Sequence, residues 1–176
     1  MLRLKNHNNE VALRILGYEF PQATDDLDAN WLNIEFTIRT PDYQWQIFNP
    51  CLLTWEAIGL VAWLRKVANC KARRSERFSG LKQDFSIYYI GKLMEQHGLR
   101  ITLRFGCIPL GMLESKSIAK RLRVAFPRLR VEFTKDGKEL NRLADVAEEE
   151  IKCFPPRGEL GMKWMQLIRM EEKGKT

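Results

Sequence analysis

The stretch that decides the fold is Gly17–Trp63, which reads GYEFPQATDDLDANWLNIEFTIRTPDYQWQIFNPCLLTWEAIGLVAW. Apolar and polar side chains alternate over Trp31–Arg39, and this pattern predicts a strand with one buried face. Pro41–Asp42 predicts a turn, so Tyr43–Phe48 is expected to be an antiparallel partner of that strand. The stretch therefore predicts an acidic loop followed by a hairpin.

Thr54 is the expected N-cap of a helix from Trp55 to about Asn69, and turns are expected near His97–Gly98 and at Asp136–Gly137. Further strands are expected at Val11–Leu16, Phe85–Tyr89, Leu99–Phe105 and Leu129–Phe133, and helices from Ser115 or Ser117 to Phe126 and from Leu140 to about Phe154. Strands joined by short turns favour an α+β fold, with a mainly antiparallel sheet and two to four helices in a single domain.

The C-terminal segment differs from the rest because Pro155–Pro156 ends the last core helix. Residues 157–176 form a tail whose apolar side chains, Leu160, Trp164, Leu167 and Ile168, have helical spacing. We therefore expect an α+β domain over residues 1–156 and an amphipathic tail over 157–176 that packs on the same domain.

Composition places the chain among ordinary globular proteins. Its 176 residues are 45% hydrophobic and 29% charged, which disfavours disordered and collagen-like classes. The longest apolar run, Ala57–Leu64, is too short for a transmembrane segment, and the N-terminus has no apolar signal region. These features predict a cytoplasmic location. The four irregularly spaced cysteines are then expected to be free, buried thiols.

The net charge of +7 is unevenly distributed along the sequence. Residues 1–60 carry four basic and eight acidic side chains, whereas residues 61–176 carry 25 and 14. The first third is therefore acidic, at −4, and the remainder is basic, at +11. A basic majority favours attraction to nucleic acid or anionic lipid, while the acidic part suits a cationic partner.

The acidic loop allows three interpretations. Asp26, Asp28 and Asn30 imitate the opening of a calcium-binding EF-hand, but Trp31 stands where that loop needs glycine and Thr37 where it needs glutamate. A solvated loop whose aspartates cap turns is the simplest alternative. The third is a docking patch for a cationic partner, formed by Glu19, Asp25, Asp26 and Asp28. We favour the docking patch and expect no metal site.

Residues suited to catalysis are scarce, so the sequence predicts a binding protein that is not an enzyme and needs no cofactor. Only two histidines are present, His7 and His97, and both are expected at the surface without a catalytic role. Nucleophile elbows, glycine-rich phosphate loops and metalloprotease motifs are missing from the sequence.

A basic segment gives the alternative function, an RNA-binding accessory protein. Its cations are Lys120, Arg121, Arg123, Arg128 and Arg130. Clustered cations suit phosphates, but stacking aromatic side chains are not interleaved with them, as single-strand binding prefers. The same pattern is typical of the wet face of an ordinary helix or strand.

Three blocks of the sequence resemble the WapI family of bacterial immunity proteins: Gly17–Pro21, Asp26–Ile34 and Asn49–Ala57. They read GYEFP, DLDANWLNI and NPCLLTWEA, and they occur in the family's order. The resemblance covers Val11–Leu64, continues loosely beyond it, and does not include the tail after Arg157.

This resemblance implies a cytoplasmic antidote used in interbacterial competition. Such a protein acts as a toxin inhibitor through protein–protein interaction, by binding the toxic C-terminal domain of a large cell-wall-associated protein. The family's namesake toxin acts on transfer RNA. Inhibitors of nucleases are often acidic, whereas this chain is basic overall, so the resemblance leaves the identity of the toxin open.

Overall fold

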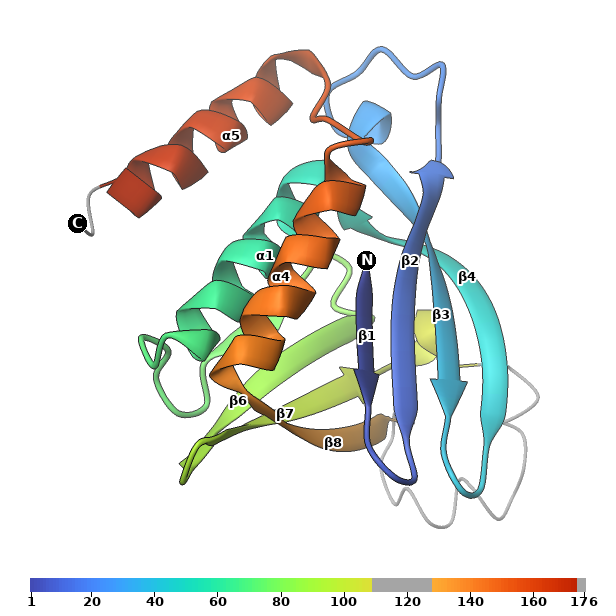
Figure 1. Ribbon diagram of the computed structural model, residues 1–176. Coiled ribbons are helices and arrows are strands. Elements are labelled where there is room, and N and C mark those ends of the chain that lie inside the picture. The colour runs from blue at the N-terminus through green and yellow to red at the C-terminus, as the bar shows by residue number, and fades with distance from the viewer. Residues whose placement is uncertain (109–127, 174–176) are drawn as a thin grey trace.

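The computed structural model describes residues 1–108 and 128–173. Within these residues the chain forms two four-stranded antiparallel sheets and three α-helices (Figure 1). The predicted α+β class, with antiparallel sheets and two to four helices in one domain, is confirmed. The helix predicted to end at Phe126 lies outside the described residues.

The first sheet has its strands in chain order: β1 (Leu2–Lys5), β2 (Glu10–Tyr18), β3 (Trp31–Arg39) and β4 (Gln44–Leu53). The alternation predicted for β3 is confirmed, because its side chains Leu32, Ile34, Phe36 and Ile38 are fully buried. Strand β4 is longer than the predicted Tyr43–Phe48, since it continues through Pro50. Proline is tolerated there because β4 is the last strand of the sheet and its register shifts at Pro50.

The second sheet contains β5 (Arg77–Ser79), β6 (Phe85–Leu93), β7 (Gln96–Leu103) and β8 (Leu129–Asp136), again in chain order. The turn expected near His97–Gly98 lies slightly earlier, at Met94–Glu95, and His97 and Gly98 are inside β7. Gly98 is explained by packing instead, since an added Cβ would collide with the side chain of Ile90.

Helices α1 (Thr54–Ala68) and α4 (Gly137–Ile151) lie side by side, and α5 (Gly158–Lys173) crosses them at one end (Figure 1). One continuous core joins α1 and α4 to both sheets. Phe36 of the first sheet meets Phe85 of the second edge to face, with ring centroids 5.7 Å apart. Since neither sheet has its own separate core, the two sheets and two helices stabilise one another.

Helices α1 and α4 both begin slightly earlier in the chain than predicted. Helix α1 begins at Thr54, so the N-cap is Leu53 and the Thr54 hydroxyl is used elsewhere. Asp136–Gly137 is not a turn, because β8 runs directly into α4 and the Asp136 carboxylate caps the helix by accepting from the Glu139 N–H at 2.7 Å.

The four cysteines are free thiols, but they are not all buried. Cys51 and Cys107 lie in the core, as expected, whereas Cys70 and Cys153 are exposed. Cys70 follows the end of α1 and Cys153 follows the end of α4, where the chain leaves the core.

Candidate functional site: the acidic loop and its supports

The acidic loop, residues 19–30, joins β2 to β3 and carries all four of the predicted partner-binding residues. Its ends are tied together, because the Glu19 N–H donates to the Trp31 carbonyl oxygen at 2.8 Å. Asp25 organises the middle of the loop: its carboxylate accepts from the N–H groups of Leu27 and Asp28 at 3.2 and 2.8 Å. The side chain of Asp25 therefore has a structural role in the turn that leads into the short 3-10 helix η1 (Asp28–Asn30).

Asn30 is fully buried, and its side-chain amide makes four hydrogen bonds. The Nδ2 group donates to the carbonyl oxygens of Asp26 and Arg157, both at 2.7 Å. The Oδ1 atom accepts from the Thr54 hydroxyl at 2.7 Å and from the Arg157 N–H at 2.8 Å. One amide thus joins the acidic loop, the start of α1 and the connection between α4 and α5, with both donors and its acceptor oxygen used.

Arg157 supports the loop from its other side. The guanidinium donates to the Pro21 carbonyl oxygen at 2.9 Å and lies 4.8 Å from the centre of the Tyr18 ring. The Tyr18 hydroxyl donates to the Pro155 carbonyl oxygen at 2.6 Å, and partial burial raises the pKa of this tyrosine. The connection between α4 and α5 therefore holds the loop in one conformation.

The carboxylates of the loop are at least partly exposed to solvent. Asp25 and Asp28 are exposed and Glu19 and Asp26 are half-buried, and within the described residues none of the four takes part in an ion pair. Asp26 lies close to the backbone of Gly158, where an added Cβ would collide with its Oδ1 atom. The structure brings all four predicted residues onto one short, fixed segment, which can attract a cationic surface without reorganising.

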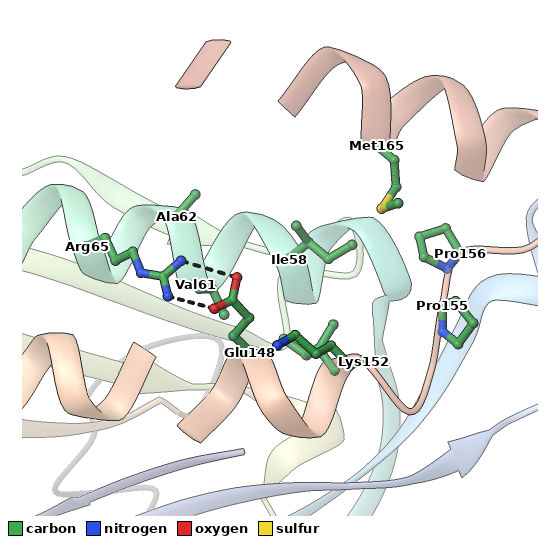
Figure 2. A pocket seen from close by; sticks show the side chains of 10 residues that line it. Ile58, Val61, Ala62, Arg65, Glu148, Lys152, Pro155, Pro156 and Met165 are labelled. Carbon is green, nitrogen blue, oxygen red and sulfur yellow. Dashed lines mark hydrogen bonds and ion pairs between the residues drawn. The ribbon is translucent and has the colours of Figure 1, made fainter. Parts of the chain in front are cut away.

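A second feature is an apolar pocket of about 330 Å³ between α1, α4 and α5, next to the α4–α5 connection that supports the loop (Figure 2). Arg65 and Glu148 form a two-pronged ion pair at one end of it, with N–O distances of 2.7 and 3.3 Å. This hydrogen-bonded pair raises the pKa of Arg65 and lowers that of Glu148. Since Arg65 also binds Asp145 at 3.0 Å, its charge is already neutralised by acidic groups of α4.

The two histidines lie in different environments. His97 is buried, not at the surface as expected, because its ring packs beside Tyr89 with centroids 5.8 Å apart. Burial lowers the pKa of His97, and its Nδ1 has no hydrogen-bond partner within the described residues. His7 is exposed in the turn between β1 and β2, where Lys5, Thr134 and Lys135 lie nearby.

The loop has little capacity to hold a metal. In residues 1–108 and 128–173 there is no group of three or more histidine, cysteine, aspartate or glutamate side chains that could hold an ion. Asn30, which the EF-hand comparison would make a ligand, has its side-chain oxygen occupied by two protein donors. Among the described helices, none has the length and apolar character needed to cross a bilayer.

The basic residues of the alternative function are only partly described. Lys120, Arg121 and Arg123 lie outside the described residues. Arg130 is exposed on β8, and Arg128 is half-buried immediately before that strand. Of the five cations, the structure therefore places only Arg128 and Arg130.

Sequence reasoning missed the two residues that fix the acidic loop. The sequence marks Asn30 only as part of the EF-hand-like opening and of the block Asp26–Ile34, and Arg157 only as the start of the tail. They lie 127 positions apart, and neither belongs to a periodic pattern. A polar residue directly before the buried Trp31 was the only available signal.

Comparison with known proteins gives one clear result. No curated protein and no solved structure matches the chain. The model of the immunity protein WapI-like family matches residues 1–155, which extends the resemblance beyond Val11–Leu64 and leaves out residues 156–176. Because this match includes both sheets, α1, α4 and the acidic loop, the chain belongs to the WapI-like family of immunity proteins.

Proposed function

We propose that this protein is an antidote that binds and neutralises the toxic C-terminal domain of a large cell-wall-associated bacterial protein. It acts in the cytoplasm of the producing cell and catalyses no reaction. The observation that carries the proposal is the family match over residues 1–155. Inhibition of this kind needs only a complementary surface with a few anchor residues, because covering or displacing an active site is sufficient.

The acidic loop is the proposed contact surface for the toxin. Two observations support this choice. The loop is held by Asn30 and Arg157, so little conformational entropy is lost when a partner binds. Its carboxylates have no ion-pair partner within the described residues, so a cationic toxin surface can pair with them without first breaking internal bridges.

The experiment uses the C-terminal domain of the large secreted protein encoded beside this gene. That domain, inactivated for handling, is titrated into the protein by calorimetry, and growth protection is measured by co-expression with the active domain. We expect one-to-one binding and protection.

The charge test is the double variant Glu19→Lys with Asp28→Lys, which leaves the turn acceptor Asp25 unchanged. A further variant, Asp25→Asn, removes the charge at this position and keeps a side-chain hydrogen-bond acceptor for the turn.

Asp42 supplies a matched control. It is exposed in the turn between β3 and β4, at the end of β3 opposite the acidic loop, and has no ion pair within the described part of the chain. Asp42→Lys raises the net charge by two, as Asp28→Lys alone does, so it should keep binding within about two-fold, while Asp28→Lys alone loses at least about ten-fold and the double loop variant loses more. Equal binding by Asp42→Lys and Asp28→Lys contradicts the loop as contact surface. Absence of binding by the wild-type protein, with retention of RNA instead, contradicts the antidote proposal itself.

A further inference from the structure

An apolar groove of about 470 Å³ lies between α1 and α5, next to the acidic loop. Its walls include Leu27 of the loop, Trp55 of α1, Leu81, and Leu160, Trp164 and Leu167 of α5. The α5 side is held to α1 by the stacked rings of Trp55 and Trp164, whose centroids are 6.4 Å apart. We refer to this feature as the α1–α5 groove.

The apolar walls of the groove are unusually open to solvent. Leu81 is 61% exposed, Leu167 54%, Trp164 43% and Leu27 41%. These side chains lie together around one hollow, whereas apolar residues that are exposed singly need no explanation. A contiguous apolar patch of this kind is typical of a protein-binding surface.

Gly59 gives a separate indication that something enters the groove. It lines the groove in the middle of α1, one turn after Trp55, where glycine weakens a helix relative to alanine. No heavy atom among the described residues lies within 4 Å of a Cβ added at Gly59. Packing inside the chain therefore does not require glycine, whereas close approach of a partner to the helix backbone does.

The charges around the groove define the chemistry of the partner. Leu27 stands between Asp26 and Asp28, so one edge of the groove is the acidic loop. Two lysines follow groove-lining elements: Lys82, next to Leu81, lies 4.5 Å from the Trp31 ring centre, and Lys163 of α5 pairs with Glu159 at 3.7 Å. An occupant that complements this arrangement has an apolar centre and cationic side chains on the side of the acidic loop.

We propose that the α1–α5 groove receives an apolar segment of the toxin domain, flanked by cationic residues that pair with the acidic loop. This inference rests on the proposed function and adds a specific second contact to it. Helix α5, which forms this wall of the groove, lies beyond residues 1–155, the part of the chain that the family model matches. A wall outside the matched region is suited to the recognition of one particular toxin.

The test fills the groove without weakening the fold. Gly59→Leu places a side chain in the open space and improves helix propensity, so the melting temperature should stay equal or rise. Toxin-domain affinity, measured by calorimetry on the full chain, should fall at least about ten-fold. Gly59→Ala adds one methyl group and should change affinity less than about three-fold.

A charge in the groove provides a second variant with its own control. Leu167→Glu should also weaken binding at least about ten-fold. The control is Leu93→Glu on the hairpin between β6 and β7, where Leu93 is 80% exposed and contributes nothing to the groove. It should change affinity less than about two-fold.

The outcomes separate this inference from the proposed function. If the wild-type protein binds the toxin domain and Gly59→Leu and Leu167→Glu bind equally well, the groove inference is wrong and the antidote function stands. If the wild-type protein does not bind the domain, both fail. If sedimentation instead finds a wild-type dimer that Gly59→Leu converts to monomer, a second copy occupies the groove and the inference is overturned.

Discussion

The side chain of Asn30 brackets the backbone of Arg157, donating to its carbonyl oxygen at 2.7 Å and accepting from its N–H at 2.8 Å. The two hydrogen bonds resemble those between paired residues of adjacent β-strands, with the Asn30 side-chain amide in place of one strand's backbone. It fixes the chain between α4 and α5 against the acidic loop, although the two residues are 127 positions apart. The conformation of the proposed toxin-binding loop therefore depends on a segment near the C-terminus.

Asn30→Ala should be strongly destabilising. The substitution removes four hydrogen bonds and leaves buried partners such as the Thr54 hydroxyl without an acceptor. We expect a loss of about 2–4 kcal/mol in the free energy of unfolding, measured by urea denaturation. Asn8→Ala is the control, because Asn8 is exposed and only its backbone N–H is hydrogen-bonded to Asn6, so the loss should stay within about 0.5 kcal/mol. Equal losses in the two variants contradict the role given to Asn30.

Much of the fold could be predicted because its long elements are periodic. Strand β3 alternates over nine residues, and the helical spacing of Leu140, Leu143 and Ala147 marks α4. Short strands were missed: β1 and β5 have four and three residues, which is too few for a period to be seen. The predicted N-cap at Thr54 was wrong for another reason. The Thr54 hydroxyl donates to the Asn30 side chain, a contact that local sequence does not reveal.

The acidic loop was singled out by its charge alone, and its role as the contact surface stays a prediction. The acidic residues Glu19, Asp25, Asp26 and Asp28 stand out in the sequence, and the structure brings them onto one fixed loop. The groove beside them could not be predicted, because it combines the loop, α1 and α5, which are distant in sequence. That residues 157–176 belong to the same domain stays a prediction.

Glu56 should give stability a specific pH dependence. Its carboxylate accepts from the N–H groups of Leu53 and Leu81 at 2.9 and 2.7 Å, and burial raises its pKa above the ordinary value of 4.5. Between 4.5 and the raised pKa the folded state binds more protons than the unfolded state, so stability rises as the pH falls through this window.

The measurement compares wild type with Glu56→Gln, which does not titrate. Urea unfolding from about pH 7 down to about pH 4.5 should show the wild-type protein gaining stability relative to the variant. A constant difference between the two proteins over that range means that the Glu56 pKa is not raised by folding. A difference that changes in the opposite direction means that its hydrogen bonds outweigh burial.

Thiol reactivity should divide the four cysteines into two classes. Cys70 and Cys153 are exposed and should react with a thiol reagent in the native protein. Cys51 and Cys107 are buried, and the hydrogen bond between their thiols together with burial raises the pKa of Cys51. They should react only after unfolding, because the thiolate is the reactive form. The number of groups labelled with and without denaturant tests this, and Cys70→Ser with Cys153→Ser should abolish native labelling.

The acidic loop should act mainly on the rate of association with the toxin domain. The chain has a net charge of +7, so its long-range field repels a cationic partner, and the loop supplies local attraction at the contact site. Asp28→Lys should therefore lower the association rate constant at low salt, by about ten-fold, with a smaller change in dissociation. The screening length falls from about 14 Å at about 50 mM salt to about 4 Å at about 500 mM, so the difference in association rate between wild type and variant should shrink across that range.

Stopped-flow measurement of the association rate of both proteins, with Asp42→Lys as the control for net charge, tests this prediction. If Asp42→Lys slows association as much as Asp28→Lys, steering is a property of the net charge and the loop has no special position in recognition.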